Sequence, residues 1–418
     1  MKVMLVGGGA REHALAWKLS QSPKVEEIFA VPGNAGTALL GENLPLSTSD
    51  ISGLIQAAEE RRVDLVVVGP EAPLASGLVD ELKSRGIPAF GPSKKAAEIE
   101  SSKVFAKELM QKNGIPCARS KSFLSFEEAE TYLKSQSAPI VVKADGLAGG
   151  KGSIVASSLG EALEALSRIM RDKIFGSAGD RVLIEEYLQG KEASFFAFAD
   201  GENLTPMIPA CDYKRALDGD QGPNTGGMGG YSPSEFFTPQ LSAQVMEKIM
   251  RPTLEALEGE GRPYKGVLYA GLMITAEGPK VLEFNCRFGD PETQVTLPLL
   301  HTDLVDIIQA VLDNRLKGVK IEWSSEFCVG VVLASGGYPG SYRTGFPIGG
   351  LDSLDRDVLV FHAGTRREEG KVVTSGGRVL TVVARGKNLA EARAKAYSNV
   401  ERINFEGCFY RRDIALRI

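Results

Sequence analysis

The sequence predicts a multidomain protein of α/β and α+β class: a parallel α/β domain, a central domain of strands and helices, and a small α+β domain. Over the first hundred residues, short apolar runs alternate with helical patterns, which is typical of a parallel sheet. The middle of the chain combines antiparallel-type strand pairs with glycine-rich loops, and a new set of strands followed by one helix begins after Trp323. We expect domains at residues 1–102, 103–318 and 319–418.

Composition limits the function classes. With 418 residues and 43% hydrophobic content, the chain can form two or three domains with real cores. The net charge of −5 is well mixed, so neither a nucleic-acid-binding nor a membrane-surface protein is indicated. The five cysteines form no CxxC pair, which gives no sign of a zinc site or a disulfide framework. Without a signal peptide or a long apolar run, a cytoplasmic protein with no obligatory protein partner is expected.

In the first domain, each predicted strand ends in a loop that contains glycine. Ligands of parallel sheets bind outside the carboxyl ends of the strands, where these loops lie. Candidate substrate contacts on these loops are Gly9, Arg11, Asn34 and Glu71. The predicted strands are 2–6, 27–31 and 65–68, and the predicted helices are 12–20, 51–60, 77–85 and 103–113.

The first of these loops, GGGAREH, follows a strand and opens a helix. Gly7 and Gly9 match part of a dinucleotide fingerprint, but Glu12 stands where its third glycine belongs and no acid ends the next strand. An NAD-dependent oxidoreductase is an alternative that only this loop favours. A helix N-terminus behind glycines also forms an anion cradle, and Arg11 would help it to hold a phosphate ester. The structural alternative is a tight strand-to-helix turn, which would need Gly7 and Gly9 but would not explain Arg11.

KADGLAGGKG, residues 143–152, lies between predicted strands 140–143 and 153–156. It fails as a Walker motif, because Asp145 replaces the required glycine and the flanks are strands. A glycine-rich hairpin that carries a lysine still lets backbone N–H groups approach phosphates. Lys143 ends an apolar strand, and a buried lysine needs an anionic partner.

The remaining strands are predicted from apolar runs, with residues 212–232 left as a long loop. Strands 182–185 and 194–199 flank a turn at Gln189-Gly190, so an exposed hairpin end is the alternative explanation for Glu185 and Glu192. Strand 267–274 should pair with 280–287. The last domain should contain strands 328–334, 358–362 and 379–384 and a helix at 389–400.

VLEFNCRFGD contains the most informative polar pattern. In a strand, Glu283, Asn285 and Arg287 share one face at spacings of about 7 Å, with Leu282, Phe284 and Cys286 opposite. A carboxylate and an amide oxygen suit Mg²⁺, and the guanidinium can grip a phosphate. An ordinary solvated strand face is the alternative. A metal next to several lysines is what phosphoryl transfer requires.

These motifs together resemble the ATP-grasp fold and, within it, the phosphoribosylamine–glycine ligase (glycinamide ribonucleotide synthetase) family. The resemblance rests on Lys143 with the glycine hairpin, the Glu185 and Glu192 pair, and the row from Glu283. It also rests on GGGAREHALAW, PGNAGT, VGPEAPL, GPNTGGMG, EFNCRFGDPETQ, GGYPGSYRTG and FHAGT, which span about residues 4–376. It implies a pre-ATP-grasp first domain, a central ATP-grasp domain, and the ATP-dependent joining of glycine to 5-phosphoribosylamine.

The resemblance also implies roles for individual residues. Glu283 and Asn285 would hold Mg²⁺ or Mn²⁺, and Arg287 would reach the transferred phosphoryl group. Asp212 and Lys214 would lie near substrate, and Arg287, Lys143 and Lys214 would be catalytic. ATP would be bound by Lys103, Lys143, Gly149, Gly150, Lys151, Gly152, Glu185, Tyr187, Leu188 and Glu192.

Some positions depart from the family pattern. Tyr213 stands where the family usually has histidine, and tyrosine does not titrate near neutral pH. Ala270 occupies the place where many ATP-grasp enzymes carry another acid, so two protein metal ligands are expected. Another ATP-grasp carboxylate–amine ligase or carboxylase, and a non-catalytic nucleotide-binding module, are further alternatives.

Overall fold

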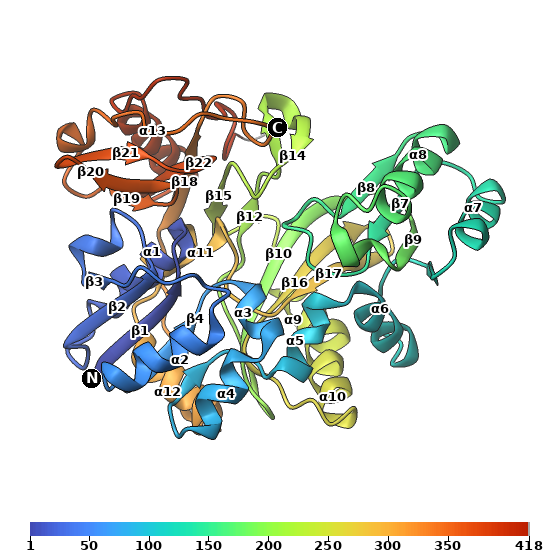
Figure 1. Cartoon of the computed structure of the whole chain (residues 1–418), viewed down its shortest axis with the longest axis horizontal. Helices are drawn as coiled ribbons and strands as arrows, with labels where there is room; N and C mark the ends of the chain where they lie inside the picture. Colours follow the sequence, from blue (N-terminus) through green and yellow to red (C-terminus); the bar gives the residue numbers. More distant parts are fainter. Residues whose placement is uncertain (417–418) are drawn as a thin grey trace.

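A computed structural model describes residues 1–416 and begins with a five-stranded parallel sheet (Figure 1). The strand order is β3-β2-β1-β4-β5, and β1 pairs in parallel with both neighbours. This confirms the parallel sheet predicted from strand–helix alternation. The strands are β1 (Lys2–Gly7), β2 (Glu27–Pro32), β3 (Glu42–Asn43), β4 (Leu65–Val68) and β5 (Ala89–Phe90).

Helices cover both faces of this sheet, which explains why residues 3–6 of β1 and all four residues of β4 are apolar. Met4 and Val6 point into one core with α2 (Ile51–Glu60) and α4 (Leu78–Ser84). Val3 and Leu5 point into another core with α1 (Ala10–Leu19) and α12 (Leu304–Leu312). Helix α12 comes from the region that the sequence assigned to the central domain. The short α3 (Glu71–Ser76) was not predicted as a separate helix.

The middle of the chain forms two antiparallel sheets. One has the order β11-β10-β16-β17, and the other, β6-β9-β7-β8, forms a lobe with α7 and α8 at the upper right of Figure 1. Strands β9 and β10 therefore belong to different sheets, and the turn at Gln189-Gly190 joins no hairpin. The bounds are β6 (Ser120–Phe123), β7 (Ile140–Ala144), β8 (Ser153–Ala156), β9 (Val182–Glu186), β10 (Lys191–Asp200), β11 (Leu204–Pro206), β16 (Lys265–Thr275), β17 (Gly278–Asn285), α7 (Phe126–Lys134) and α8 (Leu159–Met170).

The last sheet crosses the expected boundary between the central and C-terminal domains. Its order is β12-β15-β18-β22-β19, and β12 and β15 lie within residues 212–232 or at their edge. The prediction of a structureless loop there is wrong, because β15 pairs with β18 from far along the chain. The bounds are β12 (Cys211–Asp212), β13 (Arg215–Leu217), β14 (Gln221–Asn224), β15 (Gly229–Ser232), β18 (Phe327–Ala334), β19 (Leu359–His362), β20 (Thr365–Glu368), β21 (Lys371–Thr374), β22 (Arg378–Gly386) and α13 (Leu389–Val400).

The other helices connect these layers. They are α5 (Lys94–Ser101), α6 (Lys103–Lys112), α9 (Pro239–Val245), α10 (Arg251–Gly259) and α11 (Glu292–Thr296). Within residues 1–416, none of the helices has the length and apolar character needed to cross a bilayer.

Candidate active site

A cavity of about 490 Å³ lies between the lobe and the central sheet, and it brings together most of the predicted site residues. Strands β7, β8 and β9 line it from the lobe, and β10, β16 and β17 line it from the central sheet. Arg11 and Glu71 from the N-terminal region and Arg378 from the C-terminal region also line it, so parts of the chain far apart in sequence meet here. The predicted residues that line it are Arg11, Glu71, Lys103, Lys143, Gly149, Gly150, Gly152, Glu185, Tyr187, Leu188, Glu192, Asp212, Lys214, Glu283, Asn285 and Arg287.

Three predicted contacts, Gly9, Asn34 and Lys151, are not among the lining residues. The Asn34 amide donates to the backbone oxygens of Gly8, Gly9 and His362, so it fastens a loop. Lys151 Nζ reaches the Pro339 carbonyl at 3.4 Å. The geometry therefore gives Gly9 and Asn34 structural roles.

The predicted anion cradle at the start of α1 is filled by a carboxylate of the protein itself. Glu12 Oε2 accepts from Gly9 N–H at 2.7 Å, and its Oε1 lies 2.6 Å from Arg11 Nε. A Cβ at Gly7 or Gly69 would lie within 2.5 Å of the Glu12 side chain. These glycines make room for a buried carboxylate, which takes the Gly9 N–H, while Arg11 still lines the cavity.

The Glu283 row forms one wall of the cavity, with one correction to its geometry. A register shift between β16 and β17 lies opposite Leu282, which packs with Ala118, Leu188 and Met273. Phe284 and Cys286 lie in the large core, so the prediction that Leu282 shares their face is wrong. Strand β17 ends at Asn285, two residues earlier than predicted.

Arg287 is anchored by acids from the N-terminal region. Its Nε lies 3.2 Å from Glu71 Oε2, and its Nη2 lies 3.1 Å from Glu100 Oε1. Burial works against the charge of Arg287, yet these two carboxylates raise its pKa, which keeps the guanidinium ionised. Glu100 was not predicted, because α5 carries no motif that distinguishes it from a surface helix.

The residues present fit a hard divalent cation. Within residues 1–416, the Glu283 carboxylate makes no hydrogen bond or ion pair, although it faces the cavity. Asn285 Oδ1 accepts from Arg287 Nη2 at 3.1 Å, which leaves one lone pair free. No cluster of three or more acidic, histidine or cysteine side chains suited to a metal occurs in that part of the chain. One carboxylate and one amide oxygen match a cation that is held mainly by phosphates and water.

Two lysines hold a buried carboxylate at the back of the cavity. Glu185 Oε2 lies 2.7 Å from Lys143 Nζ, and Oε1 lies 2.8 Å from Lys107 Nζ. Burial alone would raise the pKa of Glu185, but the two lysines lower it, so the carboxylate stays charged. The alternative of an exposed hairpin end is therefore wrong for Glu185. Lys107 was missed, although its place four residues after Lys103 on the same helix was a usable signal.

Lys103 reaches the glycine-rich hairpin, because its Nζ donates to Gly146 O at 2.7 Å. Burial lowers the pKa of Lys103; the charge of Glu283 opposes this and that of Lys143 adds to it. Positive charge from helix α6 and from β7 thus converges below residues 146–152. This concentration of positive charge suits a polyphosphate.

A second charged group lies at the other end of the cavity. Lys214 Nζ is 3.0 Å from Glu192 Oε2, and Glu192 and Asp212 raise the pKa of Lys214 against the effect of burial. Burial raises the pKa of Asp212 to about 7, with Glu292 contributing and Lys214 opposing. Glu292 accepts hydrogen bonds from Tyr269 and Ser194. A carboxyl group that titrates near neutrality is therefore present in the cavity.

The C-terminal domain supplies Arg378, which no sequence motif distinguishes from other arginines. Its Nη2 lies 2.7 Å from Asp290 Oδ2, and its Nη1 donates to Gly226 O at 2.6 Å. Tyr213, in contrast, is not among the lining residues. Its hydroxyl accepts from Ala415 N–H, and burial raises its pKa to about 12.

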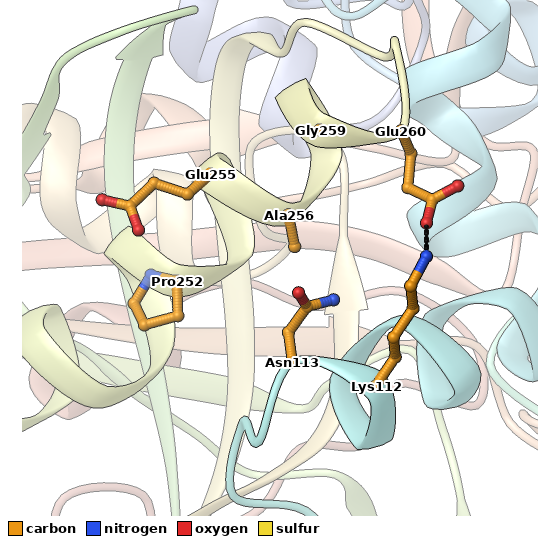
Figure 2. A pocket seen from close by; sticks show the side chains of 7 residues that line it. All are labelled: Lys112, Asn113, Pro252, Glu255, Ala256, Gly259 and Glu260. Atoms are coloured by element: carbon orange, nitrogen blue, oxygen red, sulfur yellow. Dashed lines mark hydrogen bonds and ion pairs between the residues drawn. The ribbon is translucent and has the colours of Figure 1, made fainter.

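A shallower hollow of about 300 Å³ lies on the surface between α6 and α10 (Figure 2). The exposed pair of Lys112 and Glu260 spans it, at 2.5 Å between Nζ and Oε1. It presents no buried charged side chain, so the chemistry of the molecule is concentrated in the larger cavity.

Comparison with known proteins identifies the family of the chain. Residues 1–100, 101–293 and 328–417 match the N, ATP-grasp (A) and C domains of phosphoribosylglycinamide synthetase. The chain is 52% identical, over 99% of both chains, to a phosphoribosylamine–glycine ligase of Caldanaerobacter subterraneus subsp. tengcongensis. It is 51% identical to part of a trifunctional purine biosynthetic protein of Gallus gallus, of which it covers 42%.

Solved structures show the same architecture. The phosphoribosylamine–glycine ligase of Thermotoga maritima superimposes with a TM-score of 0.86 at 37% identity, covering 99% of this chain and all of the other. At 16% identity, a Hydrogenobacter thermophilus biotin carboxylase domain in complex with MgADP shares the fold, with a TM-score of 0.74 over 98% of this chain and 91% of the other. These findings confirm the predicted three-part fold with an ATP-grasp domain. The chain belongs to the phosphoribosylglycinamide synthetase, or phosphoribosylamine–glycine ligase, family of ATP-grasp enzymes.

Proposed function

We propose that this protein joins glycine to 5-phosphoribosylamine at the expense of ATP, giving glycinamide ribonucleotide, ADP and phosphate in de novo purine biosynthesis. The observation that carries this proposal is the cavity in which the Glu283 carboxylate, unpaired within residues 1–416, lies with Lys103 and Lys143. This is the charge pattern of a metal–polyphosphate site. The family to which the chain belongs supports the choice of substrates.

The nucleotide fits the part of the cavity between the two sheets. Ala118, Leu188, Met273 and Leu282 form an apolar slot suited to an adenine ring. Glu185 and the backbone near Tyr187 lie at its edge, and Glu192 would meet the ribose hydroxyls. Lys103, Lys143 and residues 149–152 would then surround the phosphates, with Lys151 at the rim of the hairpin.

The reaction would proceed in two steps. An oxygen of the glycine carboxylate attacks the γ-phosphorus of ATP, and the bond to the bridging oxygen breaks to give glycyl phosphate and ADP. The amine of phosphoribosylamine then attacks the acyl carbon, and phosphate leaves as the amine loses a proton. Asp212, with a pKa of about 7, is suited to accept that proton.

The charged residues would favour the first step by cancelling negative charge. Arg287 is placed to contact the transferred phosphoryl group, and Lys143 and Lys214 add positive charge on either side. Mg²⁺ or Mn²⁺ held by Glu283 and Asn285 would screen the phosphate oxygens. Closure of the glycine-rich hairpin would exclude water, which would otherwise hydrolyse the acyl phosphate.

Omission of single substrates tests the proposal. Phosphate release from ATP should require both glycine and phosphoribosylamine, and glycinamide ribonucleotide should form in equal amount. Rapid ATP hydrolysis without glycine would refute it. Binding of NAD but not of ATP would favour an oxidoreductase, and ATP binding without any phosphate release would indicate a binding module.

We also propose the domain limits 1–102, 103–318 and 319–418, a cytoplasmic location, and the three small molecules as the only required partners. Arg11 and Glu71 line the cavity at its N-terminal side, next to Arg287. They are our candidates for contacting the phosphoribosylamine substrate.

A further inference from the structure

One wall of the active-site cavity is a hairpin that has little support of its own. Within residues 1–416, strands β13 and β14 pair only with each other, and residues 217–224 at the tip of the hairpin are all exposed. A two-stranded hairpin by itself is marginally stable in water. Yet Lys214, Asn224 and Thr225 at its base line the cavity.

The two sides of the hairpin base are fastened to each other. Thr225 N–H and Thr225 Oγ1 both donate to the Lys214 carbonyl, at 2.7 and 2.8 Å. Any tilt of the hairpin therefore moves the Lys214 backbone, and with it the ammonium that pairs with Glu192.

The distal end of the hairpin is held by Arg411, which is only 1% exposed. Arg411 forms a bidentate pair with Asp413, at 2.7 and 2.6 Å. Its Nη1 reaches the hairpin twice, at Asp220 Oδ1 (2.9 Å) and at Arg215 O (3.1 Å). The guanidinium also lies over the ring of Tyr213, 4.9 Å from its centroid.

Other bonds from the same segment complete the attachment. Asp413 Oδ2 accepts from Gly219 N–H at 2.8 Å, and Arg412 N–H donates to Asp218 at 2.7 Å. The Tyr213 hydroxyl accepts from Ala415 N–H. All three turn residues, 218–220, thus contact residues 411–413. In Figure 1, β14 lies beside the C-terminal domain, away from the lobe.

We propose that Arg411 is a positioning residue for the ligase reaction: it clamps the β13–β14 hairpin so that Lys214 keeps its place in the active-site cavity. Arg411 itself does not line the cavity. It acts through the hairpin, and Asp413 keeps its guanidinium oriented. This inference rests on the proposed function only for its kinetic consequence.

The test compares Arg411→Met and Arg411→Lys with Arg402→Met. Arg402 is a matched control, since it also pairs with an acid (Asp355) and a carbonyl of the C-terminal domain but does not touch the hairpin. Amide hydrogen exchange of the unliganded proteins is measured over residues 213–226. Arg411→Met should exchange roughly tenfold faster there than the control, with α13 and β22 unchanged.

Turnover is then counted per ATP-binding site, so that any unfolded fraction is excluded. Arg411→Met should lose roughly tenfold or more in kcat relative to Arg402→Met, and Arg411→Lys, which keeps the charge, should recover part of the loss. The proposal would be overturned if Arg411→Met left hydrogen exchange in the hairpin unchanged. It would also be overturned if exchange became faster in Arg411→Met while its turnover equalled that of Arg402→Met. Hydrogen exchange is measured without substrates, so its result does not depend on the proposed function. If the wild-type protein had no ligase activity, the proposed function would be refuted, and the exchange data alone would decide whether Arg411 clamps the hairpin.

Discussion

Single charged residues in the cavity differ in how completely other groups neutralise them. Glu185 is neutralised by two lysines, and Arg287 by two acids, so these side chains are held rigidly before any ligand binds. Glu283 is the exception, with no hydrogen bond or ion pair within the described part of the chain. Carboxylates in such a position are suited to a cation that arrives with the substrate.

We therefore expect Glu283→Ala to lower kcat by about 10²- to 10³-fold, because charge on the phosphoryl group would no longer be cancelled. The Mg²⁺ concentration needed for half-maximal rate should rise as well. Glu277→Ala serves as the control, since Glu277 is exposed in the turn between β16 and β17 and its carboxylate pairs with Lys280. Equal metal dependence in the two variants would contradict the metal assignment.

Asp212 allows a second test at this scale. Its pKa of about 7 means that the carboxylate form is lost as the pH falls below neutrality. A proton acceptor at this position predicts that kcat declines below about pH 7. Asp212→Asn should remove that inflection and lower kcat by roughly 10²-fold. An unchanged inflection in the variant would assign it to another group.

At the scale of elements, the start of α1 is organised around the buried carboxylate of Glu12. Three strand-end glycines create the space: Gly7, Gly9 and Gly69 each come so close to Glu12 that a Cβ would lie less than 3 Å from its side chain. The helix end therefore holds the protein's own anion, and Arg11 balances it at 2.6 Å.

Gly69→Ala should accordingly destabilise the protein by about 2–4 kcal/mol, because the added Cβ would lie 2.1 Å from Glu12 Oε1. The matched control is Gly259→Ala near the end of α10, where nothing lies within 4 Å of the added atom. That change should be neutral or slightly stabilising. Guanidinium unfolding of both variants checks the difference, and similar midpoints would contradict the packing argument.

At the scale of the whole molecule, the N-terminal and C-terminal regions meet at a buried histidine. His13 of α1 accepts a hydrogen bond from His362 N–H of β19 at 2.8 Å, and its ring packs against Phe361. Burial, and then His362, lower the pKa of His13 to about 3. The junction is therefore built for a neutral imidazole.

This predicts a loss of stability in acid. The unfolded chain binds a proton on His13 near pH 6.5, whereas the folded protein resists it until about pH 3. The contribution of the neutral His13 to the free energy of unfolding is complete above pH 6.5. It decreases as the pH falls toward 3, and about 2 kcal/mol is lost at pH 5. Between pH 7.5 and pH 5, His13→Gln should lose less unfolding free energy than the wild-type protein, by that amount. The exposed control His301→Gln should lose as much as the wild-type protein. Equal losses in both variants would contradict the prediction.

Local sequence determined the elements and most of the chemistry. Strand–helix alternation gave the parallel sheet, the helix at 389–400 and strands 65–68 and 153–156 match their predicted bounds, and the spacing of Glu283, Asn285 and Arg287 places all three on the cavity. These features depend on the periodicity of apolar residues and on residue type, both of which can be read directly from the sequence.

Tertiary structure decided which elements and side chains contact each other. β15 becomes a strand because β18 offers it an edge, and α12 covers the N-terminal parallel sheet, which lies far from it in sequence. Glu12 fills its own helix end, and Glu100, Lys107, Arg378 and Arg411 gain their roles only from partners distant in sequence. Charge pairing at such separations depends on how the sheets pack, because local sequence sets a side chain's direction but not the group that it meets.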